Sequence, residues 1–197
     1  PRGLLYGAGR MLRESVYDRD GYTLPAWRGE SAPHGLVRGM YYASHFHNWY
    51  HAASEAEIVR YTEDLALWGI NALMAAFPAI DLQGWDDPQT GQALEMLRRF
   101  ARAAHGLGMQ FATGANNTWF KSTPRELLAP PLPDPTGRRG NSGYPVCPGS
   151  EAGHAYILEN ARRLFSELAE EGIDLLVCWP YDEGGCPCER CAPWGAN

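Results

Sequence analysis

The sequence carries little positive charge and almost no lysine. Its 17 basic residues are outnumbered by 23 acidic ones, which gives a formal net charge of −6, and Lys121 is the only lysine. A chain that binds nucleic acid usually has a basic excess, so we expect no nucleic-acid partner. No apolar run approaches the roughly 18 residues of a transmembrane helix, so we expect no membrane partner either.

The first ten residues, PRGLLYGAGR, lack an initiator methionine and the charge, apolar block and cleavage site of a signal peptide. We therefore expect the chain to be cut from a longer protein. Localisation stays open between the bacterial cytoplasm and the periplasm or exterior. Cysteines are few, and the clustering of most of the five near the C-terminal end is not typical of a disulfide framework.

Apolar runs alternate with helical patterns along the chain. Strands are expected at residues 36–44, 70–77, 109–115 and 173–181, and helices at 2–14, 54–69, 90–108 and 151–171. A polar linker is expected at residues 17–35. Strands that alternate with helices pair in parallel through right-handed crossovers, so the sequence predicts an α/β fold.

Two of the expected helices have recognisable starts. Ser54 and Glu57 form an S-x-x-E capping box. The apolar face of the helix that follows is expected to carry Ile58, Tyr61, Leu65 and Trp68. Thr90 is the expected cap of the next helix. These signals place the helix starts within a residue or two.

Two α/β folds compete: a doubly wound open sheet and a (β/α)₈ TIM barrel. No G-x-G-x-x-G follows the first strand, so the fingerprint of a dinucleotide-binding sheet is absent. Polar and aromatic residues collect after each strand, on the face where barrels build their active sites. Because a whole barrel needs about 250 residues, the four visible βα units predict its first half. A long loop, residues 116–150, suggests a substrate loop.

Asp182 and Glu183 end the fourth strand and are the candidate catalytic pair. Carboxylates at that position can divide acid and stabilising roles, and the alternative is a helix-capping Asp beside a solvated Glu. Trp179 and Tyr181 precede them, and one of these rings can form the wall of a sugar site. Core packing is the alternative for Trp179.

Three cysteines, Cys186, Cys188 and Cys191, form a C-x-C-x-x-C pattern. With Cys147 from the preceding loop as a fourth ligand they would make a closed, structural zinc site. Reduced thiols and disulfide pairing remain the alternatives.

Further candidates are expected to contact substrate. His45 and Asn116 follow the first and third strands and are candidate hydrogen-bonding residues. For His45 the alternatives are a metal site shared with His47 and a plain polar loop. Arg38 opens the first strand and is either a salt-bridged structural residue or a donor to sugar hydroxyls. The aromatic content of 12% also fits a carbohydrate site with stacking platforms.

Four segments together resemble glycoside hydrolase family 20 β-N-acetylhexosaminidases and the related α-glucuronidases: RGLLYGAGRMLR, VRGMYY, LALWGINALM and CWPYDEGG. The resemblance implies that residues 1–35 are the end of an accessory α/β domain plus a linker. It implies that residues 36–197 are the N-terminal half of a catalytic barrel.

The resemblance also implies roles for single residues. Glu183 matches the general acid/base, Asp182 the residue that orients the acetamido group of the substrate, and Arg38 an arginine that holds sugar hydroxyls. No cofactor is implied for catalysis. The segment AAFPAIDL lacks the histidine-rich motif of true hexosaminidases, and no aspartate follows Arg38 and Gly39, so the superfamily is better supported than the N-acetylhexosamine substrate.

We therefore expect a glycoside hydrolase that cleaves a glycosidic bond of an oligo- or polysaccharide. Its partner would be the rest of its own barrel, and the 197-residue chain alone is expected to be inactive and poorly soluble, because unpaired strand edges and an uncovered apolar face promote aggregation. The alternative is a non-catalytic carbohydrate-binding or scaffold protein stabilised by zinc.

Overall fold

A parallel sheet organises the chain. The computed structural model describes residues 2–44, 46, 48–114, 118–130, 145–178 and 186–192. Within them, the sheet contains β3 (Gly39–Tyr42), β4 (Ala72–Ala75), β5 (Gln110–Gly114) and β6 (Leu175–Val177). The strands lie in sequence order and each pairs in parallel with the next. The predicted α/β fold is confirmed, and the arrangement is consistent with part of a TIM barrel.

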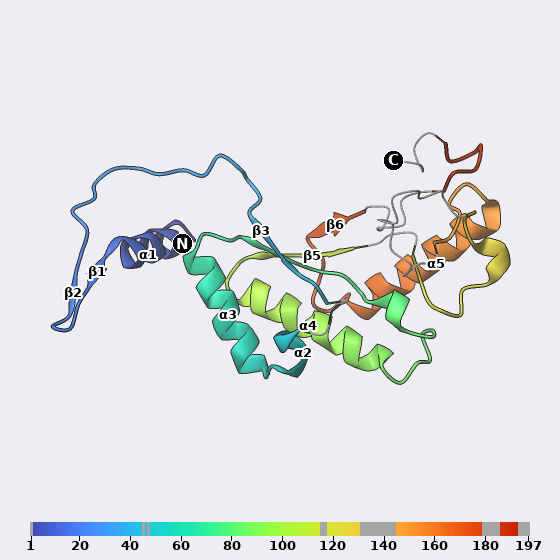
Figure 1. Cartoon of the computed structure of the whole chain (residues 1–197), viewed down its shortest axis with the longest axis horizontal. Helices are drawn as coiled ribbons and strands as arrows, with labels where there is room; N and C mark the ends of the chain where they lie inside the picture. The colour runs from blue at the N-terminus through green and yellow to red at the C-terminus, as the bar shows by residue number, and fades with distance from the viewer. Residues whose placement is uncertain are drawn as a thin grey trace.

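Helices connect the successive strands. The connections run through α3 (Glu55–Leu67), α4 (Thr90–Gly106) and α5 (Glu151–Glu167), with short helices α2 (Trp49–Ala52), η1 (Ala79–Asp81) and η2 (Arg125–Leu127) in the loops. In Figure 1, α3 and α4 lie on the same side of the sheet. No helix in the described part of the chain has both the length and the apolar character needed to cross a membrane.

The core lies between the sheet and these helices. Leu73 and Phe111 are register partners on β4 and β5, and both are fully buried. Tyr42 points to the same face and meets the ring of Phe100 on α4 edge-on, with ring centroids 4.6 Å apart. Strand side chains alternate between faces, so Tyr41 lies on the opposite face, where it is 41% exposed.

The N-terminal segment packs at one end of this layer. Helix α1 (Arg2–Glu14) contacts α3, and the Arg13 guanidinium donates to the Leu67 carbonyl. At the start of the expected polar linker, β1 (Val16–Tyr17) and β2 (Tyr22–Thr23) form a short hairpin that the sequence did not predict. Its turn is closed because the Asp18 carboxylate accepts two backbone amides, a local bond that strand periodicity does not reveal.

Helix boundaries confirm part of the predictions and correct others. The capping box of Ser54 and Glu57 is present at the start of α3. Trp68 is not on the buried face: it is the C-cap of α3, 68% exposed, and lies under the Arg13 guanidinium. Thr90 is the first residue of α4 rather than its cap, because its hydroxyl donates to the Gly84 carbonyl.

Candidate functional site

The carboxyl ends of the parallel strands meet at one edge of the sheet, where the sequence predicts the active site. Most of the predicted site residues lie outside the described part of the chain: His45, Asn116, Trp179, Tyr181, Asp182 and Glu183. What the structure does describe at this edge is the framework around them: the segments that leave β3, β4 and β5, and the residues that follow β6.

The exits from β3 and β4 are tied together. The Ser44 hydroxyl donates to the carbonyl of Ala76, and the His51 ring lies 2.9 Å from the Ser44 carbonyl through Nε2. Ser44 and His51 line a cavity of about 520 Å³ together with Met96 and Arg99 of α4. The first two exits from the sheet are therefore hydrogen-bonded to each other beside this cavity.

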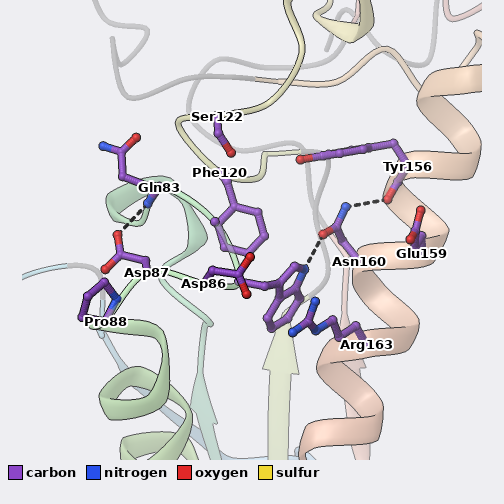
Figure 2. A pocket seen from close by; sticks show the side chains of 12 residues that line it. Gln83, Asp86, Asp87, Pro88, Phe120, Ser122, Tyr156, Glu159, Asn160 and Arg163 are labelled. Carbon is purple, nitrogen blue, oxygen red and sulfur yellow. Dashed lines mark hydrogen bonds between the residues drawn. The ribbon is translucent and has the colours of Figure 1, made fainter.

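A second cavity, of about 630 Å³, lies between the segment after β4 and helix α5 (Figure 2). Trp85 is one of the residues that line it. One face of the indole stacks on Phe77 at 5.4 Å, and the Arg163 guanidinium lies 4.7 Å from the ring centroid. The Trp85 Nε1 group donates to the Oδ1 atom of Asn160 over 2.7 Å. Both faces and the polar edge of this ring are therefore in use, so it is not a free platform for a sugar.

The polar lining of this second cavity has mixed charge. Asp86 and Glu159 supply carboxylates and Arg163 supplies a cation, as Figure 2 shows. The Asn160 side chain also donates to the Tyr156 carbonyl, so it is buried with both of its functions satisfied. The contact between Trp85 and Asn160 joins the β4 exit to α5. No local sequence pattern indicates this contact, because Trp85 and Asn160 are 75 residues apart.

Arg38 lies at the opposite edge of the sheet. It directly precedes β3, and its amide donates to the side chain of Asn71, which directly precedes β4. Its guanidinium donates to the carbonyls of Gly69 (2.6 Å) and Gly35 (3.0 Å) and stacks over the ring of Tyr6. Among the described residues its partners are backbone carbonyls and an aromatic ring rather than a carboxylate. These contacts support a structural role, while sugar binding by Arg38 stays a prediction.

The structure brings the four predicted cysteine ligands together. Cys147 lies in a short antiparallel pairing: its amide donates to the Leu127 carbonyl, and Val146 beside it bridges Leu128. The other three follow β6, and the amide of Cys191 donates to the Cys188 carbonyl in a tight turn. Two segments about 40 residues apart thus converge on one point.

The sulfur atoms of this thiol cluster (Cys147, Cys186, Cys188, Cys191) are mutually close. Cys147 Sγ lies 3.4 Å from that of Cys186, 3.7 Å from that of Cys188 and 4.0 Å from that of Cys191. All four lie within 4.8 Å of one another. These distances exceed the bond length of about 2.05 Å in a disulfide, and all four are free thiols.

The surroundings shift the pKa values of the thiols in opposite directions. Burial raises the pKa of Cys186, which is fully enclosed. The Cys186 thiol, with the amides of Arg190 and Cys191, lowers the pKa of Cys188 to about 7. Four sulfur atoms at these distances have the chemistry and spacing to hold a metal ion without leaving an open coordination position. Cys178, by contrast, is exposed and outside the cluster.

Comparisons with known proteins bear on the fold. No family model matches the chain, and no curated protein matches it. Among solved structures, a chitobiase from Flavobacterium johnsoniae aligns over 99% of this chain at 14% identity with a TM-score of 0.52. A GH20 exo-β-N-acetylglucosaminidase from Vibrio harveyi, solved with N-acetylglucosamine, aligns over 83% at 14% identity with a TM-score of 0.47. The chain spans about a third of the length of each protein (30% and 31%), and the likeness to the chitobiase shows a shared fold.

Proposed function

We propose that this chain is the N-terminal half of the catalytic barrel of a glycoside hydrolase. The observation that carries the proposal is the sheet: four consecutive parallel strands, with polar segments after each, in a fold shared with the chitobiase over 99% of the chain. In a barrel built this way the catalytic residues stand at the carboxyl ends of the strands. The division into an accessory segment, residues 1–35, and a barrel half, residues 36–197, is part of the same proposal.

In the proposed reaction Glu183 protonates the glycosidic oxygen as the bond to the leaving sugar breaks. Asp182 orients the group that attacks the anomeric carbon; in a hexosaminidase-like enzyme this group is the acetamido oxygen of the substrate itself, an exception to the usual two-carboxylate scheme. His45, Asn116, Trp179 and Tyr181 would contact the sugar from neighbouring strand ends. The substrate class is an N-acetylhexosaminide or a glucuronide.

The test uses the longest natural form of the protein that contains this chain. Turnover is measured on 4-nitrophenyl glycosides of N-acetylglucosamine, N-acetylgalactosamine, glucuronic acid and glucose. Glu183→Gln is expected to lower kcat/KM by about 10²–10⁴-fold, because it removes the general acid but keeps the shape of the side chain. Glu170→Gln, at an exposed position after α5, is the matched control and should retain activity.

Asp182→Asn separates the two carboxylates. If Asp182 orients an acetamido group, the variant loses activity on N-acetylhexosaminides. Unchanged turnover in Glu183→Gln would refute the catalytic assignment. Binding of oligosaccharides without turnover by the unmodified protein would identify a carbohydrate-binding protein instead.

A further inference from the structure

We propose that the thiol cluster is a structural zinc site in which Cys147, Cys186, Cys188 and Cys191 bind one Zn²⁺. A zinc–sulfur bond is about 2.3 Å long, so the sulfurs of a regular tetrahedral site stand about 3.8 Å apart. The three separations measured from Cys147, 3.4, 3.7 and 4.0 Å, scatter around that value. All four sulfurs lie within 4.8 Å of one another, so a small contraction of the sulfur cage brings every pair to the tetrahedral spacing.

The backbone holds two of the sulfurs in place. The amides of Cys191 and Ala192 both donate to the Cys188 carbonyl, each over 2.9 Å, which closes a tight turn between Cys188 and Cys191. The sulfurs of these two residues lie 3.7 and 4.0 Å from that of Cys147. The turn therefore sets the spacing of two of the proposed ligands.

Gly149 shows how closely the two segments approach. A Cβ atom at this position would lie 2.7 Å from Cys191 Sγ and 3.0 Å from the Cβ of Arg190. The Arg190 guanidinium donates to the Gly149 carbonyl over 3.3 Å, which closes the same contact from the other side. Only glycine allows the chain before α5 to pass this near to the sulfur cage.

The site would cross-link parts of the chain that are distant in sequence. Cys147 stands directly before the first turn of α5, whose cap Ser150 also donates to the Cys147 carbonyl. Cys186 follows Glu183 by three residues in the sequence. Zinc would thus fix the chain just after Asp182 and Glu183, while β6 fixes it just before them. A contribution of zinc to the placement of these two carboxylates rests on the proposed function; zinc binding itself does not.

Metal content of the purified protein tests the site directly. The protein is prepared under reducing conditions without added metal and analysed by plasma mass spectrometry. We expect one zinc per chain. The zinc content of the Cys188→Ser variant should be lower by at least about tenfold, because the substitution removes a ligand. Cys178→Ser, which changes an exposed cysteine outside the cluster, is the matched control and should keep it.

A second measurement on the unmodified protein avoids any variant that fails to fold. Alkylation followed by mass spectrometry should label Cys178 at once and the four cluster cysteines only after a strong chelator is added. Gly149→Ala should speed zinc release to the chelator by at least about tenfold, while Gly91→Ala, with open space around its new methyl group, should not.

Three results would overturn the proposal: four freely alkylated cluster thiols, a mass that reveals disulfides in the reduced preparation, or iron in place of zinc. The glycosidase assay separates the two proposals. Zinc at one per chain with no glycosidase activity keeps the metal site and removes the proposed function, and activity without zinc does the reverse.

Discussion

At the scale of single residues, Asp174 controls the entry into β6. One carboxylate oxygen accepts both the amide of Phe111 on β5 and the Nε2 group of His105 at the end of α4, each over 2.8 Å. The backbone amide of Asp174 in turn donates a hydrogen bond to the Phe111 carbonyl. Burial raises the pKa of Asp174, but the Phe111 amide and the His105 ring lower it by more, so its pKa lies below the ordinary value.

Asp174→Asn is therefore expected to destabilise the protein at neutral pH and less so in acid. A carboxyl whose pKa is depressed by folding stabilises the native state above its unfolded pKa of about 3.9, and this contribution is lost as the pH falls through the folded pKa. We expect a loss of about 1 kcal/mol at pH 7, a modest value because the side chain is 40% exposed.

Urea unfolding of both proteins between pH 7 and pH 3 measures this difference. The two curves should converge as the pH falls below about 4. Asp64→Asn, on the exposed side of α3, is the control and should leave stability nearly unchanged. A gap that stays constant down to pH 3 would show that the charge of Asp174 is not the cause.

At the scale of elements, the spacing of apolar residues predicted those helices and strands that bury an apolar face. The alternation of apolar runs gave β4 and β5, and the S-x-x-E pattern gave the start of α3. Predictions were wrong where a distant partner decides the outcome. Trp68 has the spacing of a core residue, but it lies at the surface as the C-cap of α3, with the Arg13 guanidinium of another helix over its ring. No local pattern carries such information.

The candidate site shows the same division. The clustering of three cysteines within six positions made a metal site a reasonable hypothesis, and Cys147 was joined to them from sequence position. The cavity around Trp85 was not foreseen, because its walls come from the β4 exit and α5, which are distant in sequence. Arg38 has the position in sequence of a ligand-binding arginine but faces backbone carbonyls at the amino edge.

The contact between α1 and α3 depends on one glycine. Gly9 is the buried residue of α1, and a Cβ atom there would overlap the carbonyl group of Leu67 at the end of α3. Gly9→Ala is thus expected to force the helices apart and cost about 2 kcal/mol of unfolding free energy, a typical value for overpacking. The same change at Gly7, in the same helix, meets open space.

Gly7→Ala is the matched variant, and it should stabilise the protein by about 0.5–1 kcal/mol, because alanine favours the helix. Denaturant unfolding of the two variants gives effects of opposite sign if packing of α1 on α3 contributes to stability. Effects of the same sign in both variants would mean that α1 does not pack on α3 in solution.

At the scale of the whole molecule, the two edges of the sheet have different chemistry. The carboxyl edge carries the cavities, while the amino edge is closed by arginine contacts with backbone and rings. Arg13 lies over Trp68, Arg10 over Trp27 and Arg38 over Tyr6. In a parallel α/β sheet ligands bind at the carboxyl edge. We therefore expect residues at the amino edge to contribute to stability rather than to binding.

Arg38→Ala tests this division between the edges. The variant loses the bonds from a charged group to the carbonyls of Gly69 and Gly35, so we expect about 2 kcal/mol less unfolding free energy. The structural role of Arg38 predicts an unchanged KM on the glycoside cleaved by the unmodified protein, because the guanidinium contacts backbone carbonyls at the edge away from the strand exits. Arg162→Ala, at an exposed position of α5, is the control and should change neither quantity. A KM raised at least about tenfold at unchanged stability would instead place Arg38 in the sugar site, since loss of uniform substrate binding raises KM alone.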